Sequence, residues 1–238
     1  MLAILRKEIN AFFTSPVGYL VVGLFLVANG LFLWVIPGEY NILDSEFADL
    51  SPFFELSPWI LMFLIPAVSM RLFSEEFKLG TIEILQTKPM TSLQIVLGKY
   101  FAAVILIIIA LLPSILYLYT IGQLGSTINN FDSGVVIGSY IGLLFLVLSY
   151  AAIGVFASTI SNNQIIAFLI GVCISFVLYF GFGAIASLST DLLFIEGFGM
   201  QEHFKSISRG ILDTRDILYF VCISLFFIMA TSYKLERK

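Results

Sequence analysis

Residues 71–99 read RLFSEEFKLGTIEILQTKPMTSLQIVLGK and form a long charged stretch between two apolar runs of the chain. Ser74 and the two glutamates after it predict a helix start, because serine caps N-termini and acids suit the first turn. Gly80 interrupts this helix, since glycine is a poor helix former. Thr81 is expected to cap a second short helix, which Pro89 ends. The pattern therefore predicts two short helices with a bend between them.

The segment Thr91–Gln94 has the sequence of a capping box and predicts the start of the next long helix. The bent segment would then lie at the membrane surface between two spans. Two interpretations are open from the pattern alone. It is either an amphipathic loop resting on lipid headgroups or a docking element for a soluble partner.

The composition places the whole chain in a membrane. Its 238 residues are 59% hydrophobic and 12% charged, with a mean hydropathy of +1.02. A soluble domain carries about 25% charged residues, so we expect an all-α polytopic membrane protein that forms a single domain over residues 1–238. The net charge of −4 implies no basic surface for nucleic acid.

Six apolar runs are long enough to cross a lipid bilayer. They cover residues 17–36, 57–72, 93–121, 135–158, 164–186 and 216–233. Residues 1–16 place Leu2, Leu5, Ile9 and Phe12 at helical spacing with charged residues between them, which predicts an interfacial elbow helix. Ser15 and Pro16 would cap and start the first span. A cleaved signal peptide is the alternative, but run 17–36 is longer than a usual signal core.

Prolines and glycines predict where these helices start or break. The second run begins at Ser57-Pro58, and Pro113 is expected to kink the third. Three glycines in the fifth run, Gly171, Gly181 and Gly183, would allow close helix approach. Residues 204–216 mix apolar and charged side chains at helical spacing, and Gly210 is expected to end one helical piece there.

The distribution of basic residues predicts the orientation, because cytoplasmic loops carry more Lys and Arg. One side of the membrane would hold Arg6, Lys7, Arg71, Lys78, Lys88, Lys99, Lys234, Arg237 and Lys238, and the other would hold Lys205, Arg209 and Arg215. Both termini and the 71–99 stretch are therefore expected in the cytoplasm, with the protein in the inner membrane.

The sequence contains no recognisable catalytic, nucleotide-binding or metal-binding motif. The pair Gly98-Lys99 is not a Walker A motif, because Leu93 stands where its first glycine should be. The single histidine, His203, excludes a zinc protease of the two-histidine type, and Met200 with His203 is too small a set for a metal site. We expect no catalytic, cofactor or metal site, and hence no enzyme.

The stretch 71–99 resembles the coupling segment of ABC transporter permeases of the type-2 exporter class. The resemblance rests on Glu75-Glu76-Phe77-Lys78-Leu79-Gly80-Thr81-Ile82-Glu83-Ile84-Leu85 followed by Pro89. Within that class the chain is most similar to permeases associated with gliding motility. The resemblance implies an elbow helix at residues 1–16, a cytoplasmic coupling helix between spans two and three, and short re-entrant helices before the last span. It also implies a second, smaller contact near residues 159–164.

The resemblance further implies a partner and a function. ATP would be hydrolysed by a separate ABC ATPase subunit, and the permease would pair with a second membrane subunit, a different chain being favoured over a second copy. The residues expected to dock on the ATPase are Phe73, Glu75, Glu76, Phe77, Gly80, Thr81, Glu83 and Leu85. The function implied is ATP-driven export linked to gliding motility; the alternative is a scaffold or assembly factor that holds an ATPase without transport.

Overall fold

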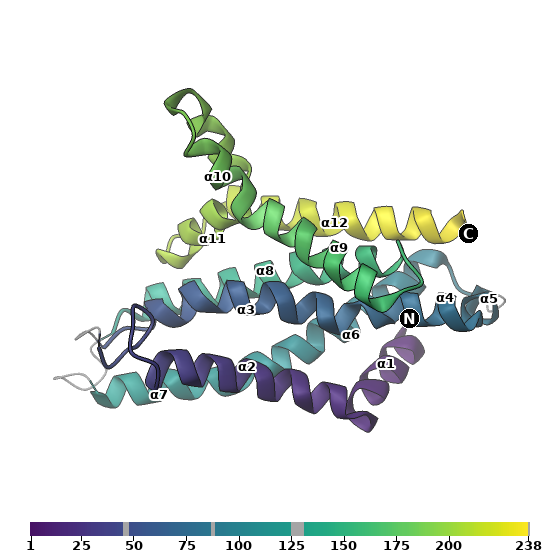
Figure 1. Cartoon of the computed structure of the whole chain (residues 1–238), viewed down its shortest axis with the longest axis horizontal. Helices are drawn as coiled ribbons and strands as arrows, with labels where there is room; N and C mark the ends of the chain where they lie inside the picture. Colours follow the sequence, from purple (N-terminus) through teal and green to yellow (C-terminus); the bar gives the residue numbers. More distant parts are fainter. Residues whose placement is uncertain (45–47, 87–88, 125–130, 238) are drawn as a thin grey trace.

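The computed structural model describes residues 1–44, 48–86, 89–124 and 131–237, and their secondary structure is helical (Figure 1). Within these residues, six helical segments are long and apolar enough to cross a membrane. They are α2 (Pro16–Trp34), α3 (Ser51–Ser69) continued by α4 (Arg71–Leu79), α6 (Ser92–Leu111) continued by α7 (Ile115–Leu124), α8 (Ser133–Ser158), α9 (Gln164–Phe176) continued to α10 (Phe182–Ala186), and α12 (Thr214–Glu236). The predicted six-span, all-α architecture is confirmed.

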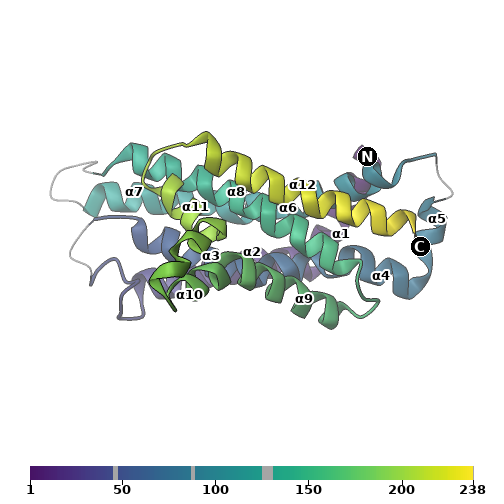
Figure 2. The same ribbon diagram turned by 90° about the horizontal axis from the view of Figure 1, so that it is seen from above.

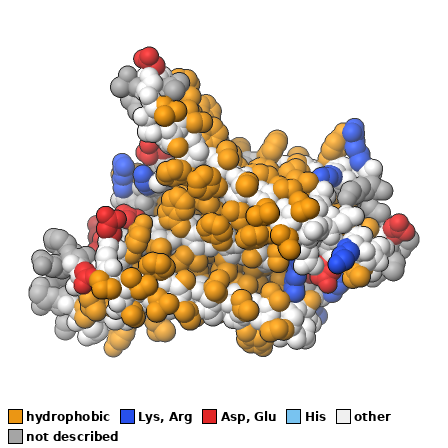
Figure 3. All heavy atoms as spheres, in the orientation of Figure 1, with side chains coloured by type: hydrophobic (Ala, Val, Ile, Leu, Met, Phe, Trp, Pro, Cys, Tyr) orange, Lys and Arg blue, Asp and Glu red, His pale blue; other side chains and the backbone are white. Residues whose placement is uncertain are grey.

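The surface of the bundle is apolar in its middle and charged toward its ends (Figure 3). On α2, for example, Leu20, Leu24 and Val27 are exposed while Phe25 is fully buried. Exposed leucine and valine side chains along a long helix require an apolar solvent, which lipid tails supply. The chain is therefore a multi-pass membrane protein.

Helix α8 forms the centre of the bundle and packs against α3, α6, α9, α11 (Met200–Ser208) and α12. Small residues along it allow this close approach. A Cβ atom added to Gly138 would lie 2.8 Å from the carbonyl oxygen of Ile207 and 3.0 Å from the Cα of Gly210. On α9, a Cβ at Gly171 would lie 3.1 Å from Pro66, which confirms the close contact predicted there. A Cβ at Gly181 would meet only Val177 of the same segment, and one at Gly183 would lie 3.7 Å from Gln201, so these two glycines make no close approach.

Several predicted helix boundaries differ in the structure. The second span begins at Ser51 rather than Ser57, with Pro52 in its first turn and Pro58 inside the helix. An internal proline is tolerated in a membrane bundle because neighbouring helices and local adjustments satisfy the freed backbone groups. Helix α4 follows α3 through Met70, which itself has helical backbone angles. Ser74 therefore lies inside a helix instead of capping one.

The predicted break at Pro113 and the predicted cap at Thr91 are confirmed, whereas the predicted cap at Ser15 is not. A short 3-10 segment (Leu112–Ser114) interrupts the third span at Pro113. The Thr91 hydroxyl accepts a hydrogen bond from the backbone of Gln94 at 3.3 Å and caps α6. Pro16 stands in the first turn of α2, but the Ser15 hydroxyl donates to the carbonyl of Phe12 instead of capping that helix.

The segment before the last span folds into short pieces that extend from the bundle (Figure 1). A 3-10 helix (Thr190–Phe198) precedes α11, and Gly210, with φ +83°, separates α11 from α12 as predicted. His203 on α11 has both ring nitrogens occupied: Nδ1 lies 2.6 Å from Asp216 Oδ1, and Nε2 lies 3.0 Å from the carbonyl of Gly197. These contacts join α11 to the start of α12 and give His203 a structural role.

Both termini lie at the same end of the bundle, together with α4 and the following helix α5 (Thr81–Gln86) (Figures 1 and 2). The helix α1 (Leu2–Thr14) lies at this end too and buries Ile4, Glu8 and Phe12. Two basic residues used to predict the orientation, Lys88 and Lys238, lie outside the described residues. The shared end agrees with the predicted topology, and its assignment to the cytoplasm stays a prediction.

The close contact at Gly138 leads to a stability prediction. Gly138→Ala should lower the free energy of unfolding by about 1–3 kcal/mol, because the new methyl group meets backbone atoms that cannot rotate away. Gly30→Ala in α2 is the control: nothing lies within 4 Å of its added Cβ, so that variant should be neutral or slightly stabilised. Chemical unfolding in detergent micelles, followed by circular dichroism, measures both. Equal stability of the two variants would contradict the packing described.

Candidate functional site

Helices α4 and α5 form a bent projection at the end of the bundle that holds both termini (Figure 1). The bend is at Gly80, whose φ of +68° lies in the left-handed region that glycine adopts without strain. Its backbone N–H closes the last turn of α4 on the carbonyl of Phe77 at 3.3 Å. The second short helix, α5, then begins at Thr81, but the Thr81 hydroxyl donates to the carbonyl of Glu76 at 3.5 Å instead of capping α5 as predicted. We call residues 71–86 the elbow; this segment is distinct from the interfacial elbow helix predicted over residues 1–16, which is α1 in the structure.

The predicted docking residues divide between the surface and the interior of the elbow. Phe73 is fully buried and Glu76 is 7% exposed. The exposed ones are Glu75, Gly80 and Glu83, and Phe77, Thr81 and Leu85 are half-buried. In this conformation the surface open to a partner therefore holds the two outward glutamates and the edges of Phe77 and Leu85, whereas Phe73 and Glu76 serve the interior.

A buried lysine from another span explains why Glu76 faces inward. Lys99 on α6 is 1% exposed. Its ammonium donates hydrogen bonds to Glu8 Oε1 on α1 at 3.0 Å and to the backbone carbonyl of Leu72 on α4 at 2.6 Å. The same nitrogen lies 2.9 Å from Glu76 Oε1. One charge therefore holds α1, α4 and α6 together.

A second lysine completes this group. Lys7 Nζ lies 2.9 Å from Glu76 Oε1 and 3.4 Å from Glu8 Oε1. Partial burial lowers the pKa of Lys7, but its hydrogen bond to Glu76 and the charges of both glutamates outweigh this and raise that pKa above its ordinary value of 10.5. The four residues Lys7, Glu8, Glu76 and Lys99, which we call the charge cluster, carry two positive and two negative charges. Removing a charge from water costs free energy, and pairing each buried charge with an opposite one offsets this cost.

Two cation–π contacts lie at the same place, where α1, α4 and α6 meet. The Arg71 guanidinium at the start of α4 lies 4.3 Å from the ring centroid of Phe12 on α1. The Lys99 ammonium lies 5.0 Å from the ring centroid of Phe73. Both are cation–π distances. The start of α4, the base of the elbow, is thus held against α1 and α6. Its tip, at Gly80 and Glu83, is exposed.

A short turn from another part of the chain approaches the tip of α4. Lys78 and residues 162–165 line a groove of about 520 Å³ between them. In that turn the Asn163 side chain accepts a hydrogen bond from the backbone of Ile165 at 2.9 Å and caps α9. The turn where a second contact was expected therefore borders the elbow at the same end of the bundle.

The charge cluster gives the second prediction. Lys99→Met should lower the free energy of unfolding by about 3–5 kcal/mol, because it leaves buried carboxylates without their central partner. Lys78→Met removes an exposed lysine from the same region and should change stability by no more than about 0.5 kcal/mol. The assay is chemical unfolding in detergent at pH 7. Should Lys99→Met prove as stable as Lys78→Met, the cluster would not hold the elbow in place.

Comparison with known proteins agrees with this architecture. A search of curated proteins found no match to the chain. A family model described as ABC-2 family transporter protein matches residues 2–221, which include the elbow, α1 and the first five spans. The match covers nearly the whole chain, so this protein belongs to the ABC-2 family of transporter proteins.

Proposed function

We propose that this chain is the permease subunit of an ATP-driven ABC transporter and that the elbow receives movement from a separate ATPase subunit. One observation carries the proposal: the elbow is a continuation of the second span and is fixed by the charge cluster to α1 and α6. Residues Ser51–Leu79 form an almost uninterrupted helical segment. A force applied at Glu75 or at the bend would therefore be carried along one helical segment into the second span.

The charge cluster extends that force to other helices. Because Lys99 bonds to both α1 and α4, displacing the elbow alone would separate buried opposite charges. Moving α1, α4 and α6 together avoids this cost. Closure of the ATPase pair would therefore move these elements as one body against the rest of the bundle, which is a rigid-body transition between two packings.

The docking surface follows from what the elbow exposes. Glu75 and Glu83 would meet basic or amide groups of the ATPase, while Phe77 and Leu85 would fill part of its groove. Leu79, 66% exposed at the end of α4, adds apolar area. The turn at residues 162–165 would make a second contact across the groove shared with Lys78.

The physiological setting is proposed from the resemblance of residues 71–99. On that basis the protein acts as an exporter linked to gliding motility, lies in the inner membrane with both termini in the cytoplasm, and pairs with a different membrane subunit. The positions of both termini and the elbow at one end of the bundle support that topology (Figure 2).

Charge reversal tests the docking surface. The double variant Glu75→Lys with Glu83→Lys should weaken binding of the partner ATPase by about tenfold or more, because it places like charges across the interface. Glu39→Lys, an exposed glutamate of the loop before α3, reverses the same charge at the other end and should leave binding unchanged. Co-purification of a Walker A–containing ATPase in mild detergent, followed by titration with that ATPase, provides the measurement.

Both reversed residues are exposed, so the double variant should fold normally, and its circular dichroism and unfolding curve verify this. ATPase affinity equal to that of the unmodified chain would show that the elbow is not the docking surface.

A further inference from the structure

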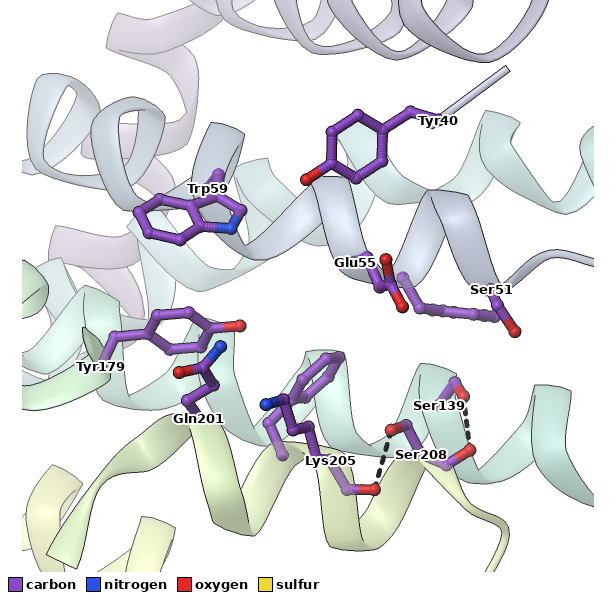
Figure 4. Close-up of a pocket in the computed structure, with 11 residues that line it drawn as sticks. Tyr40, Ser51, Glu55, Trp59, Ser139, Tyr179, Gln201, Lys205 and Ser208 are labelled. Atoms are coloured by element: carbon purple, nitrogen blue, oxygen red, sulfur yellow. Dashed lines mark hydrogen bonds between the residues drawn. The ribbon is translucent and has the colours of Figure 1, made fainter. Parts of the chain in front are cut away.

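A cavity of about 440 Å³ lies between the start of α3 and α11, toward the end of the bundle opposite the termini (Figure 1), and Figure 4 shows it in close-up. Its walls come from the loop before α3, from α3, α8 and α11, and from the π-helical turn after α9 (Val177–Gly181). The lining residues used below are Tyr40, Glu55, Trp59, Tyr179, Gln201 and Lys205. The cavity is separate from the elbow and takes no part in the proposed ATPase docking.

Aromatic rings form one part of this cavity. The Trp59 and Tyr179 ring centroids lie 5.8 Å apart with an interplanar angle of 78°, so the two rings make adjoining walls at nearly a right angle. Tyr40 lies on a further side of the same space (Figure 4). Rings arranged at an angle around a cavity present π faces and edges to an occupant, and such surfaces attract organic cations.

Opposite charges stand on the two facing walls. Glu55 projects from α3, while Lys205 projects from α11 with Gln201 one turn before it (Figure 4). Among the described residues, neither Glu55 nor Lys205 has a salt-bridge partner. Each charge is thus available to a ligand, and the amide of Gln201 adds a hydrogen-bonding group beside Lys205.

We propose that this cavity binds a zwitterionic group in which an ammonium is joined to a phosphate, as in phosphoethanolamine. Glu55 and the rings of Trp59 and Tyr179 would hold the ammonium, and Lys205 with Gln201 would hold the phosphate oxygens. A purely anionic ligand would leave Glu55 facing a like charge, and a neutral sugar would leave both charges without partners. The two facing charges therefore select for a ligand that carries both signs.

A ligand that carries an ammonium and a phosphate could come from two sources. One is the headgroup of a membrane phospholipid, and the other is a free water-soluble molecule. The binding site is the same for either, so the probes must include both.

Tryptophan fluorescence offers a direct assay, because the chain has two tryptophans. In a Trp34→Phe background, Trp59 is the single reporter and lies in the cavity wall. The detergent-purified chain is titrated with phosphoethanolamine, with short-chain phosphatidylethanolamine, with short-chain phosphatidylglycerol and with maltose. We expect saturable fluorescence changes with phosphatidylethanolamine and little response to phosphatidylglycerol or maltose. A response to phosphoethanolamine as well identifies the headgroup as sufficient, whereas a response to the lipid alone identifies a bilayer ligand.

Paired variants test the assigned charges. Glu55→Gln and Lys205→Gln should each weaken binding by about tenfold, because each removes a hydrogen bond between charged groups. Glu39→Gln and Arg209→Gln remove the same charges from exposed positions at the same end of the bundle but outside the cavity lining. Those controls should bind as tightly as the parent.

Two outcomes would overturn the proposal. One is the absence of a saturable response to both zwitterionic probes, and the other is equal or tighter binding of phosphatidylglycerol or maltose. Both are read on the Trp34→Phe protein without a charge substitution, so they stand even if a charge variant fails to fold. No ATPase is needed, so a failure here is distinguishable from a failure of the docking surface.

Discussion

The buried ammonium of Lys99 is the constraint on which this end of the molecule depends. A charge that is 1% exposed must be paired, and the structure pairs it with carboxylates from two other helices. Those carboxylates come from Glu8 near the N-terminus and from Glu76 on the elbow. The position of the elbow follows from this requirement, because a close junction of α1, α4 and α6 is needed to bring both carboxylates to the Lys99 ammonium.

In the proposed function, the same junction would let movement of the elbow act on the spans. At its base the elbow is joined to α3 through Met70, which keeps helical backbone angles. At its tip Gly80 reverses the chain into α5 without strain. The elbow therefore continues the second span at its base, whereas Glu75, Gly80 and Glu83 are exposed.

Much of this fold was predictable from the sequence. Hydropathy alone gave six spans, since long apolar helices are required to satisfy the backbone in lipid. Local signals also identified the bend at Gly80, the cap at Thr91 and the break at Pro113. The start of the second span was missed, because Ser57-Pro58 has the pattern of a helix start although Pro58 lies inside α3.

The charge cluster could not be predicted, because its members are far apart in the chain. Lys99 was counted among the loop residues, and Glu76 was assigned to the partner surface together with Glu75. Neighbouring glutamates on a helix point in different directions, and nothing in a single sequence says which one finds an internal lysine. The cavity between α3 and α11 could not be predicted for a related reason: Glu55 and Lys205 come from distant segments, and only the packing of α11 brings them to the same cavity (Figure 4).

The central claim is that α1 and the elbow move together. Spin labels on a chain whose two cysteines are replaced test it most directly, with one pair at Arg6 and Glu83 and another at Glu83 and Asn162. Pulsed electron resonance would measure both distances in the assembled transporter, without nucleotide and with ATP trapped. The account predicts that the Arg6–Glu83 distance stays constant while the Glu83–Asn162 distance changes. A change in the first distance with the second unchanged would contradict it.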